Sequence, residues 1–143
     1  MVNAKSDLID KLWNRGARNY KFIDRTFNLK ISYAKAILDY FLAKDEDYFL
    51  HFEVIPDNFP LELRERLKKF KAGSLQLEVG IQTLNLDVAK NINRNLKIDK
   101  IKENLAFLSS KTNAHMHIDL IVGLPSETID SFAQNLNLLY TLS

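Results

Sequence analysis

The sequence has few of the residues that usually mark a redox centre, a secreted protein or a membrane segment. Its 143 residues include no cysteine, only four glycines and only three prolines. Without cysteine, this chain forms no disulfide, thiolate zinc site, cysteine nucleophile or thiolate-bound iron–sulfur cluster. No apolar run approaches the roughly 18 residues of a membrane span, and the start, MVNAKSDLID, lacks a signal-peptide pattern. We therefore expect a soluble, cytoplasmic domain with no membrane segment.

Charge of one sign is also scarce, because 20 basic residues face 18 acidic ones for a net charge of +2. Such a balance gives no overall field that would attract nucleic acid or a membrane. The one basic run, LRERLKKFK at 63–71, fits the solvated face of an amphipathic helix better than a nucleic-acid contact. We therefore do not expect nucleic acid as a partner.

What the sequence does contain is an apolar fraction of 46% and no repeat or linker, which indicates a single domain over 1–143 with a packed core. Helical and strand patterns alternate along it. Helices are expected near 8–13, 34–42, 60–70, 88–92, 98–108 and 129–139, and strands at 20–24, 48–55, 74–81 and 114–123. Helices between strands imply right-handed crossovers and a parallel sheet. The pattern predicts an α/β fold with about four parallel strands, either a small open sheet or part of a larger barrel.

The segment LEVGIQTLN at 77–85 has one unusual face, since Leu77, Val79 and Ile81 alternate with Glu78, Gly80 and Gln82. The other strands share this phase, and the polar set comprises Asp24, Glu53, Gln76, Glu78, Gln82 and Asp119. Buried carboxylates without partners would be costly. Because ligands bind at the carboxyl ends of parallel strands, the pattern favours a ligand pocket over a merely solvated sheet face.

The three histidines allow a different hypothesis, a metal-dependent hydrolase. His115 and His117 precede Asp119 on one face of the fourth strand, and imidazole and carboxylate suit zinc or iron. These histidines lie at the start of the strand, however, where ligands rarely bind. We therefore assign them, together with His51, to a solvated part of the sheet.

Three segments together resemble the radical S-adenosylmethionine (SAM) superfamily: FIDRTFN at 22–28, LEVGIQTLNLDVAKNINR at 77–94, and HIDLIVGLPSET at 117–128. The resemblance covers nearly the whole chain. It is strongest to the branch whose barrel often follows a cobalamin-binding domain and which shares these motifs with the coproporphyrinogen-dehydrogenase-like and methylthiotransferase enzymes. It implies a partial (β/α) barrel with helices on the outer face, whose first and last barrel strands are missing here.

The resemblance also implies a site for SAM as a small-molecule cofactor. Gln82 and Asp119 would approach its ribose, Arg94 its carboxylate, and Glu53 its ammonium group or ribose. Asp24 and Thr26 would lie near the methionine amino group, Glu78 lower on the same face, and Ile121 near the adenine. The glycine-glycine-glutamate pattern that the family often has on its second barrel strand is replaced here by IDRTF at 23–27.

The chain departs from the family in one essential feature, the C-x-x-x-C-x-x-C loop that holds a four-iron cluster. In the family this cluster reduces SAM and cleaves it to a 5′-deoxyadenosyl radical. The resemblance therefore implies a full-length parent that carries the 4Fe-4S cluster on cysteines upstream in the reading frame, and a fragment that is inactive alone. Cobalamin would depend on a separate domain.

The alternative to such a fragment is a cluster-free binding or scaffold module. The substrate does not follow from the sequence. We expect the open sheet edges to favour self-association.

Overall fold

The structure, a computed structural model, describes residues 2–142. The helices in this range are α1 (Val2–Asn14), α2 (Ile31–Leu42), α3 (Leu61–Leu67), α4 (Leu86–Asn91), α5 (Ile98–Lys111) and α6 (Ile129–Leu142). The strands are β1 (Asn19–Lys21), β2 (Phe49–Val54), β3 (Leu75–Gln82) and β4 (His115–Leu120). Helices and strands alternate as the periodicity predicts.

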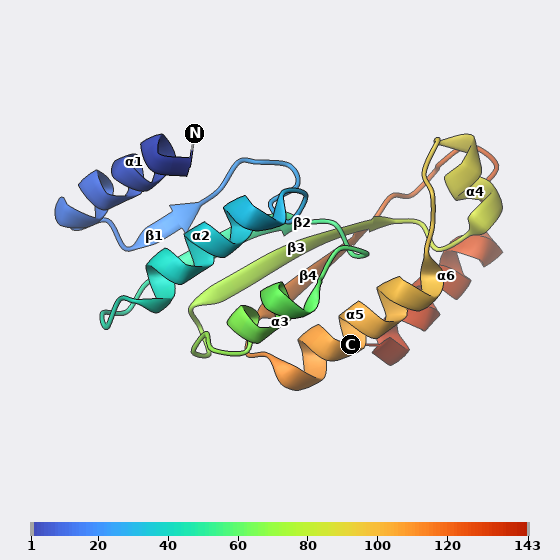
Figure 1. Ribbon diagram of the computed structural model, residues 1–143. Helices are drawn as coiled ribbons and strands as arrows, with labels where there is room; N and C mark the ends of the chain where they lie inside the picture. The colour runs from blue at the N-terminus through green and yellow to red at the C-terminus, as the bar shows by residue number, and fades with distance from the viewer. Residues whose placement is uncertain (1, 143) are drawn as a thin grey trace.

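The four strands form one sheet in the order β1-β2-β3-β4, and every neighbouring pair is parallel (Figure 1). Each strand lies beside the next one along the chain, so each connection returns through at least one helix to the same end of the sheet. This confirms the predicted α/β class with four parallel strands, in an arrangement consistent with part of a barrel.

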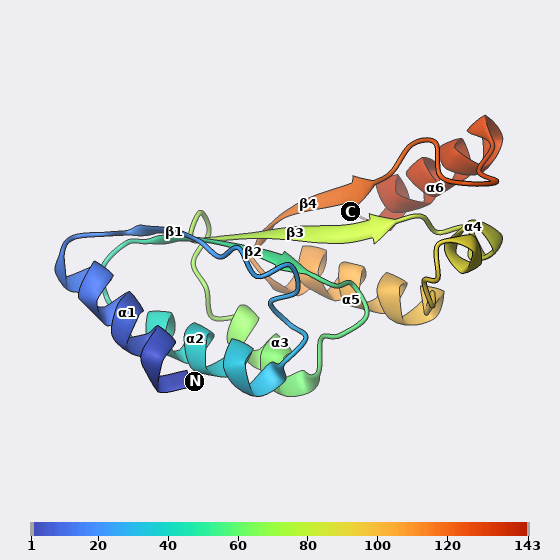
Figure 2. The same ribbon diagram turned by 90° about the horizontal axis from the view of Figure 1, so that it is seen from above.

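The apolar face of the sheet is covered by helices. Figure 2 shows α1, α2, α3 and α5 on one side of the strand layer, with α6 beside β4. Leu50 and Phe52 of β2 and Leu77 and Val79 of β3 point to this side and are at most 1% exposed. Apolar residues spaced by three and four positions on the helices meet them, which is the pattern that defines a core-facing stripe. The hydrophobic core therefore lies between the sheet and this helix layer.

Aromatic rings fill the core where β1, β2 and α2 meet. The ring of Phe52 stacks on Phe27 with 3.8 Å between centroids, and its centroid lies 4.7 Å from that of Phe22. Phe41 of α2 is fully buried and meets Tyr20 of β1 edge-on at 5.0 Å. Such pairs contribute about 0.5–1.5 kcal/mol each beyond the area they bury. They fix the segment after β1 against β2.

The first and last strands are shorter than the sequence pattern predicts. A strand was expected over 20–24, but β1 ends at Lys21. The chain still runs beside β2, since Phe22 N donates to His51 O and Phe27 N to Glu53 O, but a turn separates these contacts. The strand expected over 114–123 ends at Leu120, before a bend at Gly123, whose φ is +81°. Residues 22–24 and 121–123 therefore belong to loops.

β1 and β4 form the two edges of the described sheet. Beyond β4, Met116, Ile118 and Leu120 line a shallow groove with residues of α6. The predicted self-association through these edges stays a prediction. Within residues 2–142, no helix combines the length and the apolar character that crossing a membrane requires.

Candidate functional site

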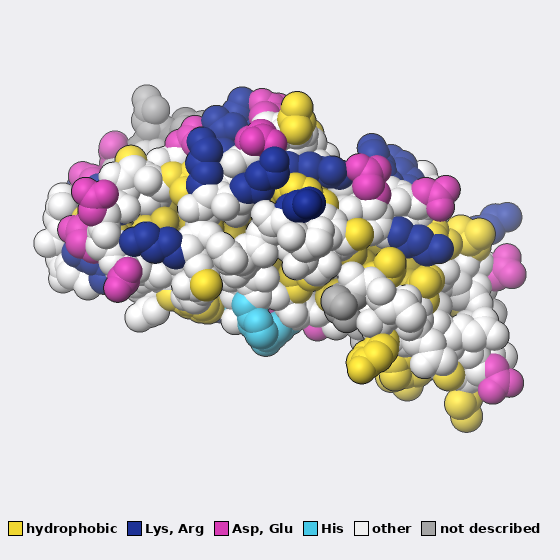
Figure 3. All heavy atoms as spheres, turned by 90° about the horizontal axis from the view of Figure 1, so that it is seen from below, with side chains coloured by type: hydrophobic (Ala, Val, Ile, Leu, Met, Phe, Trp, Pro, Cys, Tyr) yellow, Lys and Arg dark blue, Asp and Glu magenta, His cyan; other side chains and the backbone are white. Residues whose placement is uncertain are grey.

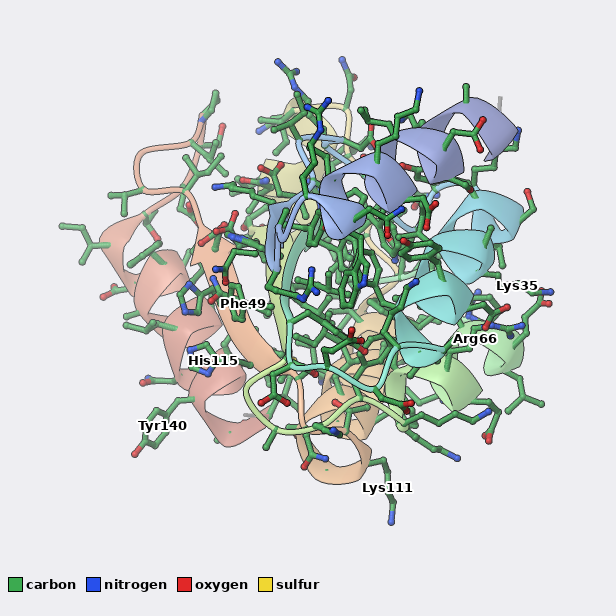
Figure 4. All side chains as sticks on the ribbon, turned by 90° about the vertical axis from the view of Figure 1, so that its left-hand side faces the viewer. Lys35, Phe49, Arg66, Lys111, His115 and Tyr140 are labelled. Carbon is green, nitrogen blue, oxygen red and sulfur yellow. The ribbon has the colours of Figure 1, made fainter. Side chains whose placement is uncertain are left out.

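The second face of the sheet is polar, because the alternate residues of β2, β3 and β4 are hydrophilic. Burial alternates along β2 and β3, with the apolar residues buried and the polar ones partly exposed. The register sets Glu53 beside Glu78, and Gly80 beside Asp119. Phe49 and His115, which share the polar phase, lie on the other side of the strands from Lys35 and Arg66 on the helices (Figure 4). The parallel register therefore brings acidic residues from three strands together.

At the carboxyl ends of the strands this face is hollowed. The hollow has a volume of about 320 Å³, within the range of about 300–1,000 Å³ that is usual for small-molecule sites. It is lined by Arg25, Thr26, Glu53, Val54, Ile55, Glu78, Gly80, Gln82, Arg94 and Asp119. Six of the eight residues that the sequence suggested for a cofactor line it, namely Thr26, Glu53, Glu78, Gln82, Arg94 and Asp119. We call this hollow the strand-end pocket.

Gln82 ends β3 in an unusual backbone conformation. Its φ is +68°, in the left-handed region that a non-glycine residue enters at a cost of roughly 1–2 kcal/mol. A shift of register between Gly80 and Gln82 accompanies it, and Gln82 O accepts a hydrogen bond from Ile121 N at 2.9 Å. Strained backbone concentrates at ligand sites. A Cβ added at Gly80 would lie 3.2 Å from Gln82 Nε2, so the glycine leaves room for this side chain.

Arg94 reaches the pocket from the segment after α4. Its Nη2 donates to Gly80 O at 2.5 Å, so the guanidinium is fixed against β3. Burial lowers the pKa of Arg94 and the nearby Asp57 opposes this effect, but guanidinium groups remain charged in proteins. The side chain of Asn85 caps α4 by accepting from Asp87 N and Val88 N. The cap and the guanidinium contact together hold a cation at the pocket wall.

Glu78 lies against a histidine of the neighbouring strand, without the geometry of a hydrogen bond. Its Oε1 lies 2.7 Å from Nε2 of His51, whose side chain is 13% exposed. His51 is therefore largely buried rather than part of a solvated face, contrary to the sequence-based expectation. His115 and His117 are exposed as expected, and Figure 3 shows histidine atoms as one cyan group at the surface.

Two of the suggested cofactor residues lie outside the strand-end pocket. Asp24 accepts from Lys5 Nζ at 3.3 Å and from Tyr33 Oη at 3.1 Å, and its hydrogen bond raises the pKa of Lys5. It lines a different, mostly apolar hollow that meets the strand-end pocket at Thr26. Ile121 is 43% exposed and follows the end of β4. The early end of β1 explains the position of Asp24, since residues 22–24 are irregular and the strand alternation no longer applies to them.

Four residues line the pocket without having been predicted from the sequence, namely Arg25, Val54, Ile55 and Gly80, and the contact of His51 with Glu78 was not predicted either. The signal for Gly80 and His51 was present, because both share the polar phase of their strands. Arg25 lies in the turn after β1, where alternation no longer predicts direction. Strand phase therefore finds pocket residues only as far as the strand extends.

A buried polar cluster fixes the loops beside the pocket. Thr83, which is fully buried, donates to Glu127 Oε1 at 3.3 Å and accepts from Asn135 Nδ2 at 3.1 Å. Asn135 Nδ2 also donates to Glu127 Oε1 at 3.0 Å, and Asn85 Nδ2 donates to Ser131 Oγ at 2.7 Å. We call these five residues the loop cluster. It joins the β3–α4 loop to the start of α6.

The described residues form no site for either of the two alternative functions, metal-dependent hydrolysis and nucleic-acid binding. Within residues 2–142, no three histidine, cysteine, aspartate or glutamate side chains gather as a metal ion requires. Three of the five cations of the basic run have acidic partners nearby, since Arg64 lies 2.9 Å from Glu103, Arg66 2.7 Å from Asp39, and Lys68 2.7 Å from Glu65. Ion pairs of this kind are typical of a solvated helix surface.

Comparison with known proteins identifies the family. The family model of the Radical SAM superfamily matches residues 6–139, which is nearly the whole chain. The chain belongs to the radical SAM superfamily, as its three motifs predicted. A search of curated proteins gave no match.

Solved structures agree with this fold. The radical SAM methyltransferase TsrM from Kitasatospora setae, with tryptophan substrate and the SAM analogue aza-SAM bound, matches with a TM-score of 0.81 at 16% identity, over 100% of this chain and 29% of TsrM. TsrM with cobalamin and a [4Fe-4S] cluster bound matches with a TM-score of 0.81 at 17% identity, over 99% of this chain and 29% of TsrM. Coproporphyrinogen III oxidase (HemN) from Escherichia coli, a radical SAM enzyme, matches with a TM-score of 0.64 at 25% identity, over 80% of this chain and 27% of HemN. The chain thus spans less than a third of the length of these structures.

Proposed function

We propose that this chain provides the SAM-binding wall of a radical SAM barrel, and that the strand-end pocket holds the methionine and ribose parts of SAM. Family membership supports SAM as the ligand. The position of the pocket supports it too, because ligands of parallel α/β proteins bind at the carboxyl ends of strands.

The observation that carries the proposal is the mixture of charges in the pocket. Three carboxylates, Glu53, Glu78 and Asp119, line it together with two guanidinium groups, Arg25 and Arg94. The formal sum of these charges is −1. SAM has an ammonium group, a sulfonium group and one carboxylate, which gives a net charge of +1. The pocket therefore carries charges of both signs with one excess negative charge. This complements the net positive charge of SAM and its mixture of cationic and anionic groups.

Each pocket residue has a role that its chemistry suits. Arg94 binds the SAM carboxylate, for which a guanidinium offers paired donors. Arg25, which the structure adds to the pocket, is a second cation for this carboxylate. Glu53 and Glu78 accept hydrogen bonds from the ammonium group, with Thr26 near the same end. Asp119 and Gln82 bind the ribose hydroxyls.

Asp24 and Ile121 are weaker candidates. Asp24 already has Lys5 and Tyr33 as partners and does not line the pocket. Glu53 and Glu78 therefore replace it as the preferred partners of the amino group in this proposal. Ile121 remains the candidate for contact with the adenine, since it follows β4 and exposes an apolar side chain.

The superfamily uses SAM as the source of an adenosyl radical, which it generates at a four-iron cluster. The cluster does not fit this chain, since thiolates usually hold it and the 143 residues include no cysteine. No electron-transfer step is therefore assigned to these residues, whose part is to bind and orient SAM. Cysteines elsewhere in the same polypeptide would distinguish a radical SAM enzyme from a cluster-free binding module. Cobalamin would need a further domain.

The proposal is tested by titrating SAM into the purified chain while backbone amide shifts are followed by NMR. We expect saturable shifts at Thr26, Glu53, Glu78, Gln82, Arg94 and Asp119. Arg94→Gln should weaken binding by about tenfold or more, because a hydrogen-bonded charge contact is lost. Arg15→Gln, a matched change at an exposed arginine just after α1, should leave affinity unchanged. An absence of saturable shifts at these strand ends in the wild-type chain would contradict the proposal.

A further inference from the structure

His51 and Glu78 form a contact below the strand-end pocket that no motif of the sequence points to. His51 lies on β2 two residues before Glu53, and its Nε2 is 2.7 Å from Glu78 Oε1 on β3. This close approach does not have the geometry of a hydrogen bond, and the buried Nε2 makes none within residues 2–142. The side chains of His51 and Glu78 are only 13% and 26% exposed. The contact is therefore more shielded from water than a typical surface ion pair.

The charges around Glu78 indicate what the contact with His51 does. Glu53 is the register partner of Glu78 on β2, so two carboxylates stand side by side on one face of the sheet. On the other side, His117 is the register partner of Glu78 on β4, and Asp119 follows it on the same face. Like charges on neighbouring strands repel each other. A basic side chain next to Glu78 offsets this repulsion and favours one orientation of its carboxylate.

The arginines of the pocket are not that basic side chain. Arg94 donates to Gly80 O, and Arg25 lines the pocket from the turn after β1. Within residues 2–142, the basic side chain in contact with Glu78 is that of His51. The imidazole contacts one carboxylate oxygen from the side of the strand starts, which leaves the second oxygen available to the pocket that Glu78 lines.

We infer that His51 is a positioning residue, which orients the carboxylate of Glu78 toward a cationic or hydroxyl group of the ligand in the strand-end pocket. This inference rests on the proposed function, since the ligand concerned is SAM. It deepens that proposal by assigning a role to a residue outside the pocket lining. His51 acts through Glu78 and does not contact SAM itself.

The competing explanation is that the pair only stabilises the sheet. Replacing His51 would then change the free energy of unfolding but leave the affinity for SAM unchanged. The two explanations separate when binding and unfolding are measured on the same variants. A variant that keeps a polar N–H group at this position without the imidazole ring makes the distinction sharper.

The experiment measures SAM binding by isothermal titration calorimetry, and unfolding by urea, for His51→Leu, His51→Gln, Glu78→Gln and the double variant His51→Leu/Glu78→Gln. We expect His51→Leu to weaken binding by about tenfold, because the close polar contact that orients the Glu78 carboxylate is lost. His51→Gln should recover most of the affinity, because its amide N–H reaches toward the same oxygen. In the Glu78→Gln background, His51→Leu should cause no further loss. His117→Leu, a matched change at the exposed register partner of Glu78, should bind as the wild type does.

The inference is overturned if His51→Leu and His51→Gln both bind SAM as the wild type does. It is also overturned if His51→Leu weakens binding equally with and without Glu78, which would show independent effects. Failure of the proposed function looks different, since the wild-type chain itself would then bind no SAM. That result removes the ligand and the inference together.

Discussion

The two faces of the sheet use the same strands for opposite purposes. On β2, Phe52 points into the helix-covered core and is fully buried, while the adjacent Glu53 points into the strand-end pocket. The core face consists of apolar side chains in close contact. The pocket face places carboxylates side by side and ends β3 in a strained conformation at Gln82. The core face therefore stabilises the fold. The pocket face lowers the stability through its like charges and its strained residue, and these residues form the site.

The largest effect is expected on the core face. Phe52→Ala should lower the free energy of unfolding by about 3–5 kcal/mol, because it removes a buried ring and leaves a cavity among Phe22 and Phe27. Glu53→Gln, the adjacent change on the pocket face, should alter it by about 0.5 kcal/mol or less. Urea unfolding of both variants measures this difference. Equal destabilisation by the two changes would refute the division between the faces.

A smaller effect of opposite sign is expected at Gln82. Gln82→Gly should raise the free energy of unfolding by up to about 1 kcal/mol, because glycine adopts the left-handed conformation without steric cost. The same change should weaken SAM binding, since the amide group is lost. Gln76→Gly, on the same face of β3, should instead destabilise by about 0.5–1 kcal/mol. Thermal unfolding and calorimetry distinguish these outcomes, and a destabilised Gln82→Gly would show that the strain is not released.

The smallest effect on stability is expected at Tyr40 of α2, which contacts Asp10 of α1 outside the sheet. Burial, followed by a hydrogen bond to Asp10, raises the pKa of Tyr40 to about 12. The folded chain keeps this proton at pH values where the unfolded chain has lost it. The resulting stability is fully present below the ordinary tyrosine pKa of about 10 and is lost as the pH rises through about 12.

Asp10→Asn should therefore lower the pKa of Tyr40 and reduce this alkaline loss of stability. Ultraviolet difference spectroscopy measures the titration, and Tyr40→Phe identifies the signal of this tyrosine among the five in the chain. An unchanged titration in Asp10→Asn would show that burial alone causes the shift.

The fold could be predicted from the sequence because its signals are periodic. Alternation along β2 and β3 gave their faces correctly, and the spacing of Ile37, Leu38 and Phe41 gave the buried side of α2. The prediction was less accurate where the chain leaves the hydrogen-bonded pairing of the sheet. The strand expected over 20–24 ends at Lys21, because the turn at 25–28 interrupts the backbone hydrogen bonds to β2 between Phe22 and Phe27.

The candidate site was predicted in part for the same reason. Strand phase led to Glu53, Glu78 and Asp119, which all line the pocket. It also favoured Asp24, whose partners Lys5 and Tyr33 come from α1 and α2 and could not be inferred from a single strand. Pairing across strands, as between His51 and Glu78, depends on register, which alternation does not specify. The roles of these residues toward SAM remain predictions.

The loop cluster has a consequence for motion. Its hydrogen bonds tie the β3–α4 loop, which leads to Arg94, to the first two turns of α6 through Thr83, Glu127 and Asn135. Buried hydrogen bonds of this kind open together, because breaking one leaves the remaining polar groups unpaired. The wall that carries Arg94 and the helix after β4 should therefore fluctuate as one cooperative unit. Order imposed on the pocket would then spread to α6, beside β4.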